Sequence, residues 1–369
     1  MSPVSKVIFA HDWLNGMRGG EKCLELMTAQ YPDSPIYTLF YEKEKVSQEI
    51  ASHPVRASWL SHFPGAQKNY RSFLPLYPTA IESFRLPPCD LVLSMSHCVA
   101  KSINKPKRAV HVSYCFTPMR YAWGFFEEYF GRKDFVQKWT IRAMLKHLRD
   151  WDRASAARVD HFVAISQHIR DRIKRCYSRE SEVIYPPVNT KFYEPDHRAR
   201  TEDFYLVVSA LTPYKRVDLA VLAAKKLGKK LIVIGEGPER KRLETLAAGS
   251  AEFLGWQPDE VLRDHYRRAK ALLFPGEEDF GIVPVEAQAC GCFVIAHGKG
   301  GALETVLRDE TGVFFDELEA DSLAAAIQRF EGRTWNPDAP RKNAARFSND
   351  RFIMEMKSMI QRVSHIKVT

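Results

Sequence analysis

Two acidic residues, Glu278 and Glu286, stand eight positions apart in the most chemically specific stretch of the chain, EDFGIVPVE. Glu278 ends a loop after a buried strand pattern. Glu286 is expected in the first turn of a helix that begins near Pro284, where proline and carboxylates are both favoured. Carboxylates accept paired hydrogen bonds from neighbouring hydroxyl groups, so one acid could hold a hexose and the other a ribose. A capped helix with an incidental acid is the alternative interpretation.

The backbone between the two acids offers a second kind of contact. At the start of that helix the amides of residues 280–283 have no acceptor inside the helix, so they suit sugar hydroxyls or phosphate. The residues expected to bind a ligand here are Phe280, Gly281, Ile282 and Val283.

Short apolar runs that alternate with helix patterns must position these groups. In the second half, helix patterns cover 217–226 and 239–247. Strand patterns lie at 204–209, 230–234, 252–254, 271–274 and 292–296. Alternating strands and helices predict a parallel sheet that is covered on both faces.

The first half begins in the same way. A strand at 6–10, a Gly-rich turn at 15–20 and a helix at 21–30 form the opening of a Rossmann-like unit, in which helix amides can meet phosphate. Further strand patterns lie at 90–94, 109–114 and 161–165, and a terminal helix pattern covers 349–363.

The predicted fold class is therefore α/β, with two Rossmann-like domains facing a central cleft. Pro186-Pro187 and the polar stretch 194–203 interrupt the chain between them. We expect an N-terminal domain over 1–187, a C-terminal domain over 188–345, and a helix within 346–369 that packs back on the first domain.

Composition excludes several classes of protein. The 369 residues are 45% hydrophobic and 27% charged, which is ordinary for a soluble globular enzyme. No run approaches the ~20 apolar residues that cross a bilayer, and no secretion signal is recognised at the N-terminus. The seven cysteines form no C-x-x-C pair, which indicates buried reduced thiols in a cytosolic protein.

The positive charge is concentrated in the first half. Residues 1–185 carry 27 Lys and Arg against 18 Asp and Glu, whereas residues 186–369 carry 27 of each kind. A one-sided basic surface suits an anionic partner such as a membrane surface or a pyrophosphate-linked lipid, although a solvated helix face explains it equally well. Nucleic acid is not an expected partner, because no DNA- or RNA-binding motif is present. No G-x-G-x-x-G follows the first strand, which disfavours a dehydrogenase.

Several motifs together resemble a known family. They are SALTPYKRVD (209–218), GEGP (235–238) and GGALE (300–304), besides the two-acid stretch. The chain resembles the retaining glycosyltransferases of family 4, which have the two-lobed GT-B fold. Three motifs of the first half, HDWLNGMRGGEK (11–22), SMSHCVAKS (94–102) and YCFTPMRYAW (114–123), resemble mannosyltransferases of bacterial surface-polysaccharide and O-antigen synthesis.

The resemblance implies roles for residues of the second half. Glu278 would contact the donor hexose, and Glu286 would bind the ribose. Lys215 and Arg216 would neutralise the diphosphate, which gains negative charge as the glycosidic bond breaks. In this fold the leaving phosphate is thought to take the acceptor proton, so no carboxylate nucleophile is required.

The resemblance also concerns the first half. Gly19 and Gly20 would let a loop approach the donor diphosphate and the reacting sugar. Two positions depart from the family pattern, since many members have Arg at the position of Ala210 and His at that of Phe116. Without that Arg, stabilisation of the phosphate depends more heavily on Lys215 and Arg216.

Five residues of the first half are candidates for binding the acceptor. His97 and Lys101 follow a strand at its carboxyl end, where such sheets bind ligands, although a capped helix explains them equally well. Arg120 and Tyr121 could hold an acceptor sugar or its phosphate, or could simply pack a loop. Glu21 either touches acceptor hydroxyls or caps its helix.

A metal site is not expected. Asp150-Trp151-Asp152 resembles the metal-binding Asp-x-Asp of the other large glycosyltransferase fold, but it lies in a helix pattern. Residues two apart on a helix do not share a face, so they do not ligate one ion. The same stretch combines aromatic and basic residues, which fits either an interfacial helix or core packing.

The resemblance as a whole implies a metal-independent, cofactor-free retaining hexosyltransferase in the cytoplasm. The expected donor is a nucleotide diphosphate sugar, GDP-mannose by the branch resemblance. The expected acceptor is a saccharide or oligosaccharide, carried on a polyprenyl diphosphate, with peripheral attachment to the inner face of the cytoplasmic membrane. A nucleotide-sugar epimerase or a glycan phosphorylase on the same fold is the alternative.

Overall fold

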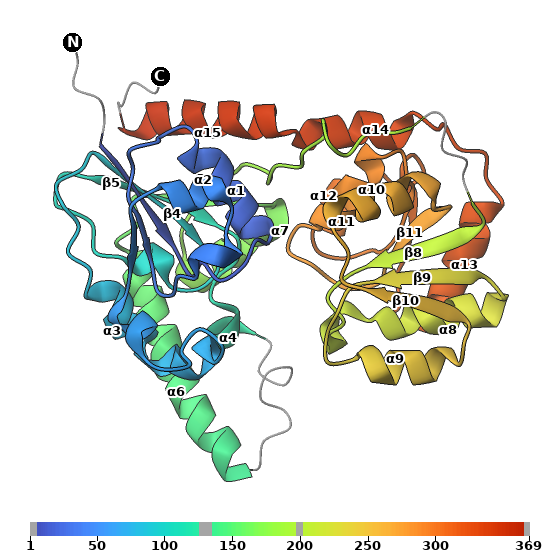
Figure 1. Cartoon of the computed structure of the whole chain (residues 1–369), viewed down its shortest axis with the longest axis horizontal. Helices are drawn as coiled ribbons and strands as arrows, with labels where there is room; N and C mark the ends of the chain where they lie inside the picture. The colour runs from blue at the N-terminus through green and yellow to red at the C-terminus, as the bar shows by residue number, and fades with distance from the viewer. Residues whose placement is uncertain (1–5, 125–134, 197–201, 365–369) are drawn as a thin grey trace. The chain divides into compact units, whose positions relative to one another are not determined.

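In the computed structural model of the chain, parallel strands form two separate sheets (Figure 1). The structure describes residues 6–124, 135–196 and 202–364. It divides into two units: the first joins Met1–Pro186 with Phe352–Thr369, and the second is Pro187–Arg351. The α/β class and the two Rossmann-like domains predicted from the sequence are confirmed.

The first unit is built on a seven-stranded sheet in the order β3-β2-β1-β4-β5-β6-β7. Its strands are β1 (Val7–His11), β2 (Ile36–Thr38), β3 (Val55–Ala57), β4 (Leu91–Ser96), β5 (Val110–Cys115), β6 (His161–Ala164) and β7 (Ser181–Val183). Every strand pair is parallel, and β1 and β4 are buried along their whole length because they are central.

Helices and 3-10 turns connect these strands. The helices are α1 (Gly19–Thr28), α2 (Gln48–Ser52), α3 (Tyr77–Glu82), α4 (Arg120–Trp123), α6 (Phe135–Ala156), α7 (Gln167–Tyr177) and α15 (Asn349–Ser364). The 3-10 turns are η1 (Lys43–Lys45), η2 (Trp59–His62), η3 (Tyr70–Leu76) and η4 (Ala100–Ser102).

The second unit is built on a six-stranded parallel sheet in the order β10-β9-β8-β11-β12-β13. Its strands are β8 (Phe204–Val208), β9 (Lys230–Ile234), β10 (Ala251–Gly255), β11 (Ala271–Phe274), β12 (Val294–His297) and β13 (Gly312–Phe315). Its helices are α8 (Val217–Leu227), α9 (Arg240–Ala247), α10 (Asp259–Arg268), α11 (Ile282–Ala289), α12 (Ala302–Thr305), α13 (Ala320–Glu331) and α14 (Ala339–Ala344), with 3-10 turns η5 (Pro213–Lys215) and η6 (Ala345–Phe347). Helices α8, α9 and α13 lie on one side of this sheet and α10, α11 and α12 on the other (Figure 1).

Both sheets contain a point at which the strand order reverses. In the first unit it lies between β1 and β4, and in the second between β8 and β11. Loops that leave two such neighbouring strands diverge to opposite faces of the sheet, which opens a crevice at their carboxyl ends. Ligand-binding side chains are therefore expected directly after these four strands.

Four strands were not expected from the sequence: β2, β3, β7 and β13. They are only three or four residues long. Runs this short display no alternation, so neighbouring strands rather than local pattern decide that they pair.

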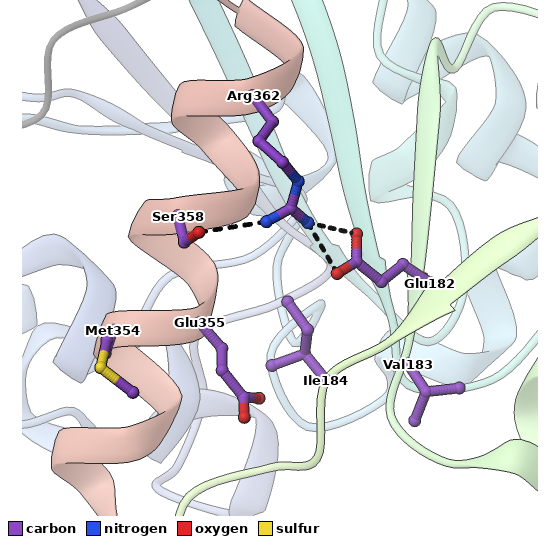
Figure 2. Close-up of a pocket in the computed structure, with 7 residues that line it drawn as sticks. All are labelled: Glu182, Val183, Ile184, Met354, Glu355, Ser358 and Arg362. Atoms are coloured by element: carbon purple, nitrogen blue, oxygen red, sulfur yellow. Dashed lines mark hydrogen bonds and ion pairs between the residues drawn. The ribbon is translucent and has the colours of Figure 1, made fainter.

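The C-terminal helix α15 packs on the first unit, as predicted. The ring of Phe352 meets that of Tyr114 edge to face at 5.5 Å, which ties the helix to β5. Farther along, Arg362 donates two hydrogen bonds to the Glu182 carboxylate at 2.7 and 2.8 Å, next to edge strand β7 (Figure 2). A pocket of about 390 Å³ lies between this helix and β7.

All seven cysteines lie within the described residues, where they are buried and form no disulfide, as predicted. Burial raises the pKa of the Cys89 thiol to about 11, which disfavours the reactive thiolate at neutral pH. No helix in the described part of the chain is long and apolar enough to cross a bilayer.

Candidate active site

A buried carboxylate organises the carboxyl ends of β1 and β4 in the first unit. Asp12 follows β1 directly and is fully buried. Its two oxygens accept hydrogen bonds from the backbone amides of His97, Cys98, Val99 and Ala100 at 2.6 to 3.0 Å. One side chain therefore fixes the start of the loop that leaves β4. It also fixes the position of His97, which is predicted to bind the acceptor.

The His97 side chain is 31% exposed and lies against Asp12, with 3.1 Å between its Nδ1 and the carboxylate. The edge of Trp13 approaches its ring at a centroid distance of 4.4 Å. Burial lowers the pKa of His97; Asp12 opposes this effect, and the nearby charge of Arg120 adds to it. The neutral imidazole is therefore the favoured form at neutral pH.

Glu21 belongs to the interior rather than to a ligand surface. It is 2% exposed, accepts a hydrogen bond from the Arg18 amide at 3.0 Å, and lies 3.4 Å from His11 Nε2. Burial alone would raise the pKa of Glu21, but the hydrogen bond and charge of His11 lower it overall. The carboxylate thus caps its helix and contacts His11. A contact between Glu21 and acceptor hydroxyls stays a prediction.

Gly19 and Gly20 lie in a helix and not in the predicted turn. We expected them in a turn before a helix that starts at residue 21, but α1 already begins at Gly19, where the Glu21 carboxylate accepts the Arg18 backbone amide and so caps the helix. Gly20 still allows a close approach, since a Cβ at this position would lie 3.3 Å from the ring of Phe116. Contact of the two glycines with a diphosphate stays a prediction.

Lys101 is a structural residue. It is 1% exposed, and its ammonium forms an ion pair with Asp152 at 2.7 Å. The same ammonium donates to the Ser155 hydroxyl at 3.3 Å. The charge of Lys101 is thus used inside the unit, and binding of an acceptor by Lys101 stays a prediction. The partner in this ion pair, Asp152, is the second acid of the Asp-x-Asp stretch and lies in helix α6.

Arg120 and Tyr121 form the first turn of α4, close to a basic pocket. This pocket has a volume of about 510 Å³ and lies between α4 and α6. Its lining consists of Tyr121, Ala122, Trp123, Gly124, Arg142, Leu145, Lys146 and Arg149. Three of these residues are cationic and none is acidic, so the lining favours an anionic ligand.

In the second unit, the loops after β8 and β11 bring Lys215 and Glu278 together. The Lys215 ammonium forms an ion pair with the Glu278 carboxylate, and both side chains are largely buried. The two loops touch through their backbones as well, because a Cβ at Gly276 would lie 3.0 Å from the Lys215 Cα. An anionic ligand at this point would compete with Glu278 for the ammonium.

Arg216 points elsewhere. It adopts a left-handed conformation with φ of 50° at the end of η5. Its guanidinium donates to Asp218 at 3.2 and 3.3 Å. Of the two predicted phosphate-binding cations, the structure thus places Lys215 beside Glu278 and engages Arg216 with Asp218.

The helix that carries Glu286 starts earlier than expected. Gly281 takes a φ of +88°, which favours glycine, and α11 begins at Ile282 rather than near Pro284. Glu286 therefore lies in the second turn, where the helix dipole helps a carboxylate less. It is 7% exposed and accepts a hydrogen bond from the Tyr266 hydroxyl at 3.3 Å. Burial, with the Glu286 charge, holds the pKa of Tyr266 far above its usual value.

Three of the four amides predicted to be free lie at the start of α11. No backbone acceptor for the amides of Gly281, Ile282 or Val283 occurs within the described ranges. Phe280 is buried, with its ring 5.5 Å from that of Phe347. Ligand binding by these four residues stays a prediction.

Gly300 and Gly301, the two glycines after β12, have a role that was not predicted from the sequence. The Gly301 amide donates to the Glu278 carbonyl at 2.8 Å, and a Cβ at Gly301 would lie 2.3 Å from the Phe280 carbonyl oxygen. The loop that carries Glu278 therefore packs directly against the backbone of Gly301, where a side chain would not fit. The paired glycines in GGALE were the signal for this close approach.

Comparison with known families agrees with this second-unit geometry. Residues 189–347 match the model of the family described as glycosyl transferases group 1. The matched residues lie within the second unit.

Curated relatives match part of the chain. The GDP-mannose-dependent alpha-(1-6)-phosphatidylinositol monomannoside mannosyltransferase of Mycolicibacterium smegmatis is 31% identical over 193 residues, which is 44% of this chain and 50% of that protein. The D-inositol 3-phosphate glycosyltransferase of Acidothermus cellulolyticus is 34% identical over 40% of this chain and 39% of its own length. The chain thus spans half or less of these two relatives.

Solved structures match nearly the whole chain. HepE of Anabaena in complex with UDP and glucose has a TM-score of 0.71 at 18% identity, and covers 97% of this chain and 100% of that one. Sucrose-phosphate synthase from Thermosynechococcus elongatus has a TM-score of 0.73 at 17% identity, and covers 98% of this chain and 100% of its own. At such identities the likeness concerns the fold.

Proposed function

We propose that the chain is a retaining glycosyltransferase of family 4 with the GT-B fold. It would transfer mannose from GDP-mannose to a saccharide acceptor in surface-polysaccharide synthesis. The acceptor hydroxyl would attack the anomeric carbon as the bond to phosphate breaks, and the departing phosphate would take the hydroxyl proton. The observation that carries the proposal is the Lys215–Glu278 pair at the strand-order reversal of the second sheet.

The pair matches the charge changes of this reaction. A nucleoside diphosphate gains negative charge as it leaves, and a preorganised, largely buried ammonium stabilises that charge better than water does. The displaced Glu278 carboxylate would then accept hydrogen bonds from hexose hydroxyls. The amides at the start of α11 and the Glu286 carboxylate would hold the rest of the nucleotide.

Donor identity can be read from thermal unfolding. GDP and GDP-mannose at about 100 times Kd should raise the Tm by ~2 °C or more, and UDP and ADP should not, because only a ligand of the native state stabilises it. Glu286→Gln should shrink the shift, and Glu244→Gln on the surface of α9 should not.

Adding EDTA should leave this shift and the transfer rate unchanged, in line with a metal-independent reaction. A shift with uridine nucleotides alone would contradict the choice of donor. Conversion of the donor sugar without any acceptor would favour an epimerase, and dependence on inorganic phosphate would favour a phosphorylase.

We propose further that the acceptor is carried on a polyprenyl diphosphate, and that the first unit attaches peripherally to the inner face of the cytoplasmic membrane. The basic pocket between α4 and α6 supports this proposal, because its cationic lining suits phosphate groups. Names of relatives that act on phosphatidylinositol mannosides agree with a lipid acceptor.

Binding to vesicles tests the membrane proposal. The chain should sediment with vesicles that contain phosphatidylglycerol at low salt and be released at high salt. Lys146→Glu/Arg149→Glu should lower the partition coefficient by about 30-fold, at about 1 kcal/mol for each basic residue lost. The control is Lys225→Glu/Lys226→Glu on α8, which changes the net charge by the same amount and should leave the partition coefficient less affected. An absence of binding at low salt would count against membrane attachment.

A further inference from the structure

The contact between Asp12 and His97 determines which nitrogen of the imidazole carries the proton. Asp12 Oδ2 lies 3.1 Å from His97 Nδ1 and already accepts two backbone amides. An unprotonated Nδ1 would turn its lone pair toward the carboxylate at this distance, and this repulsion favours the neutral imidazole with its hydrogen on Nδ1. Nε2 is then left with a lone pair, as when a carboxylate fixes the tautomer of a metal-binding histidine.

The surroundings of the ring leave this lone pair without a partner. Trp13 covers one side of His97 edge-on at 4.4 Å, and the rings of His11 and Phe116 lie 6.3 and 6.4 Å away. Within the described residues, no group donates a hydrogen bond to Nε2, and the side chain is 31% exposed. A hydrogen-bond acceptor at this position, with the Asp12 carboxylate behind it, favours a neutral donor group and disfavours an anion.

We propose that His97 accepts a hydrogen bond at Nε2 from one hydroxyl of the acceptor sugar, and that Asp12 is the positioning residue that holds it in the tautomer able to do so. This rests on the proposed function and makes His97 specificity-determining. A site built to accept from a hydroxyl rejects the analogue that lacks it, and Nε2 likewise rejects a carboxylate or phosphate at that point.

Protonation of the ring would turn Nε2 from an acceptor into a donor, so sugar binding should weaken as pH falls. The ionisable groups that face His97 are Asp12 and His11 from β1 and its end, Glu21 from α1 and Arg120 from α4. The pKa of Glu21 is lowered below its usual 4.5, and that of His97 below its usual 6.5. Weakening between pH 6.5 and 5 would therefore come from a histidine.

The tautomer can be observed directly in the unliganded protein. With ¹⁵N-labelled histidine, the His97 resonances at pH 7.5 should show Nδ1 protonated and Nε2 unprotonated, and they are assigned by their loss in His97→Gln. A ring protonated at Nε2 would overturn the inference, whatever reaction the protein catalyses.

Kinetics test the contact with sugar. The probe is the methyl hexoside that accepts sugar best in a panel, together with its monodeoxy derivatives. His97→Phe should raise the KM for this acceptor about tenfold and leave the KM for the donor unchanged, since one hydrogen bond is lost. His97→Gln, whose amide oxygen can accept, should stay within about threefold and lose the rise in KM between pH 6.5 and 5. His62→Gln in η2 should keep the wild-type profile.

One deoxy derivative should be poorer than the parent for the wild type and equal to it for His97→Phe. Equal acceptor KM in wild type and His97→Phe would overturn the inference and leave the glycosyltransferase proposal intact. Absence of transfer to every acceptor, with the donor still bound, would instead contradict the proposed function, and the tautomer measurement would remain as the separate test of Asp12 and His97.

Discussion

Lys215→Ala should lower kcat for sugar transfer by about 10²–10³ and leave the chain folded. The Lys215 side chain is 14% exposed and pairs with Glu278, so its ammonium is fixed before any ligand arrives. Charge that develops on the leaving diphosphate would meet a cation that needs no reorganisation, which is the condition under which such a group contributes most to catalysis.

The same position distinguishes charge from geometry. Lys215→Arg keeps the charge but replaces a compact ammonium by a planar group, so it should recover only part of the rate. Glu278→Ala should abolish transfer as well, because the donor hexose would lose its carboxylate contact. Rates come from single-turnover assays with saturating donor, and circular dichroism checks the fold.

Lys226→Ala is the matched control, since this lysine of α8 is exposed and pairs with Asp321 on the surface. Its activity should equal that of the wild type. Full activity in Lys215→Ala or Glu278→Ala would remove the assignment of the second-unit site.

Asp152→Ala should lower the free energy of unfolding by about 3–5 kcal/mol, because it leaves the Lys101 ammonium buried without its counter-charge. The Asp152 carboxylate also accepts hydrogen bonds from Tyr177 and Trp123, both at 2.7 Å. Lys101→Ala should cost a similar amount. Urea unfolding followed by tryptophan fluorescence measures both effects.

A double-mutant cycle separates the pair from its surroundings. Lys101→Met/Asp152→Leu should cost less than the sum of the single changes, because neither charge is then left buried alone. Removal of Asp321, the exposed partner of Lys226, should cost at most ~1 kcal/mol. Single changes at Lys101 and Asp152 that cost as little as this control would contradict the structural role given to Lys101.

The parts of the fold that the sequence predicted best are those with long local signals. Strands β9 and β11 were expected with the bounds that they have, because each is a continuous apolar run between turn residues. The start of α11, the helix that carries Glu286, was predicted two residues too late. There a single left-handed glycine, Gly281, decides the start of the helix, and the more familiar signal of Pro284 was misleading.

The site residues divide in the same way. Lys215 and Glu278, 63 positions apart, were both expected, and parallel strand topology brings them together. The ion pair of Lys101 was not predicted because its partner, Asp152, lies 51 positions away on a helix whose packing no local pattern reveals. Asp12 was missed for a similar reason, since the amides that it binds lie 85 to 88 positions along the chain.

The path of the chain bears on how chimeric proteins can be made. Because Phe352 and Arg362 pack on Tyr114 and Glu182, the first unit is discontinuous in sequence, and the second is an insertion between its two pieces. A gene truncated after residue 187 would encode a sheet stripped of its terminal helix. Grafting of the second unit from a relative should therefore replace 187–351 as an internal cassette and retain both flanks of the recipient.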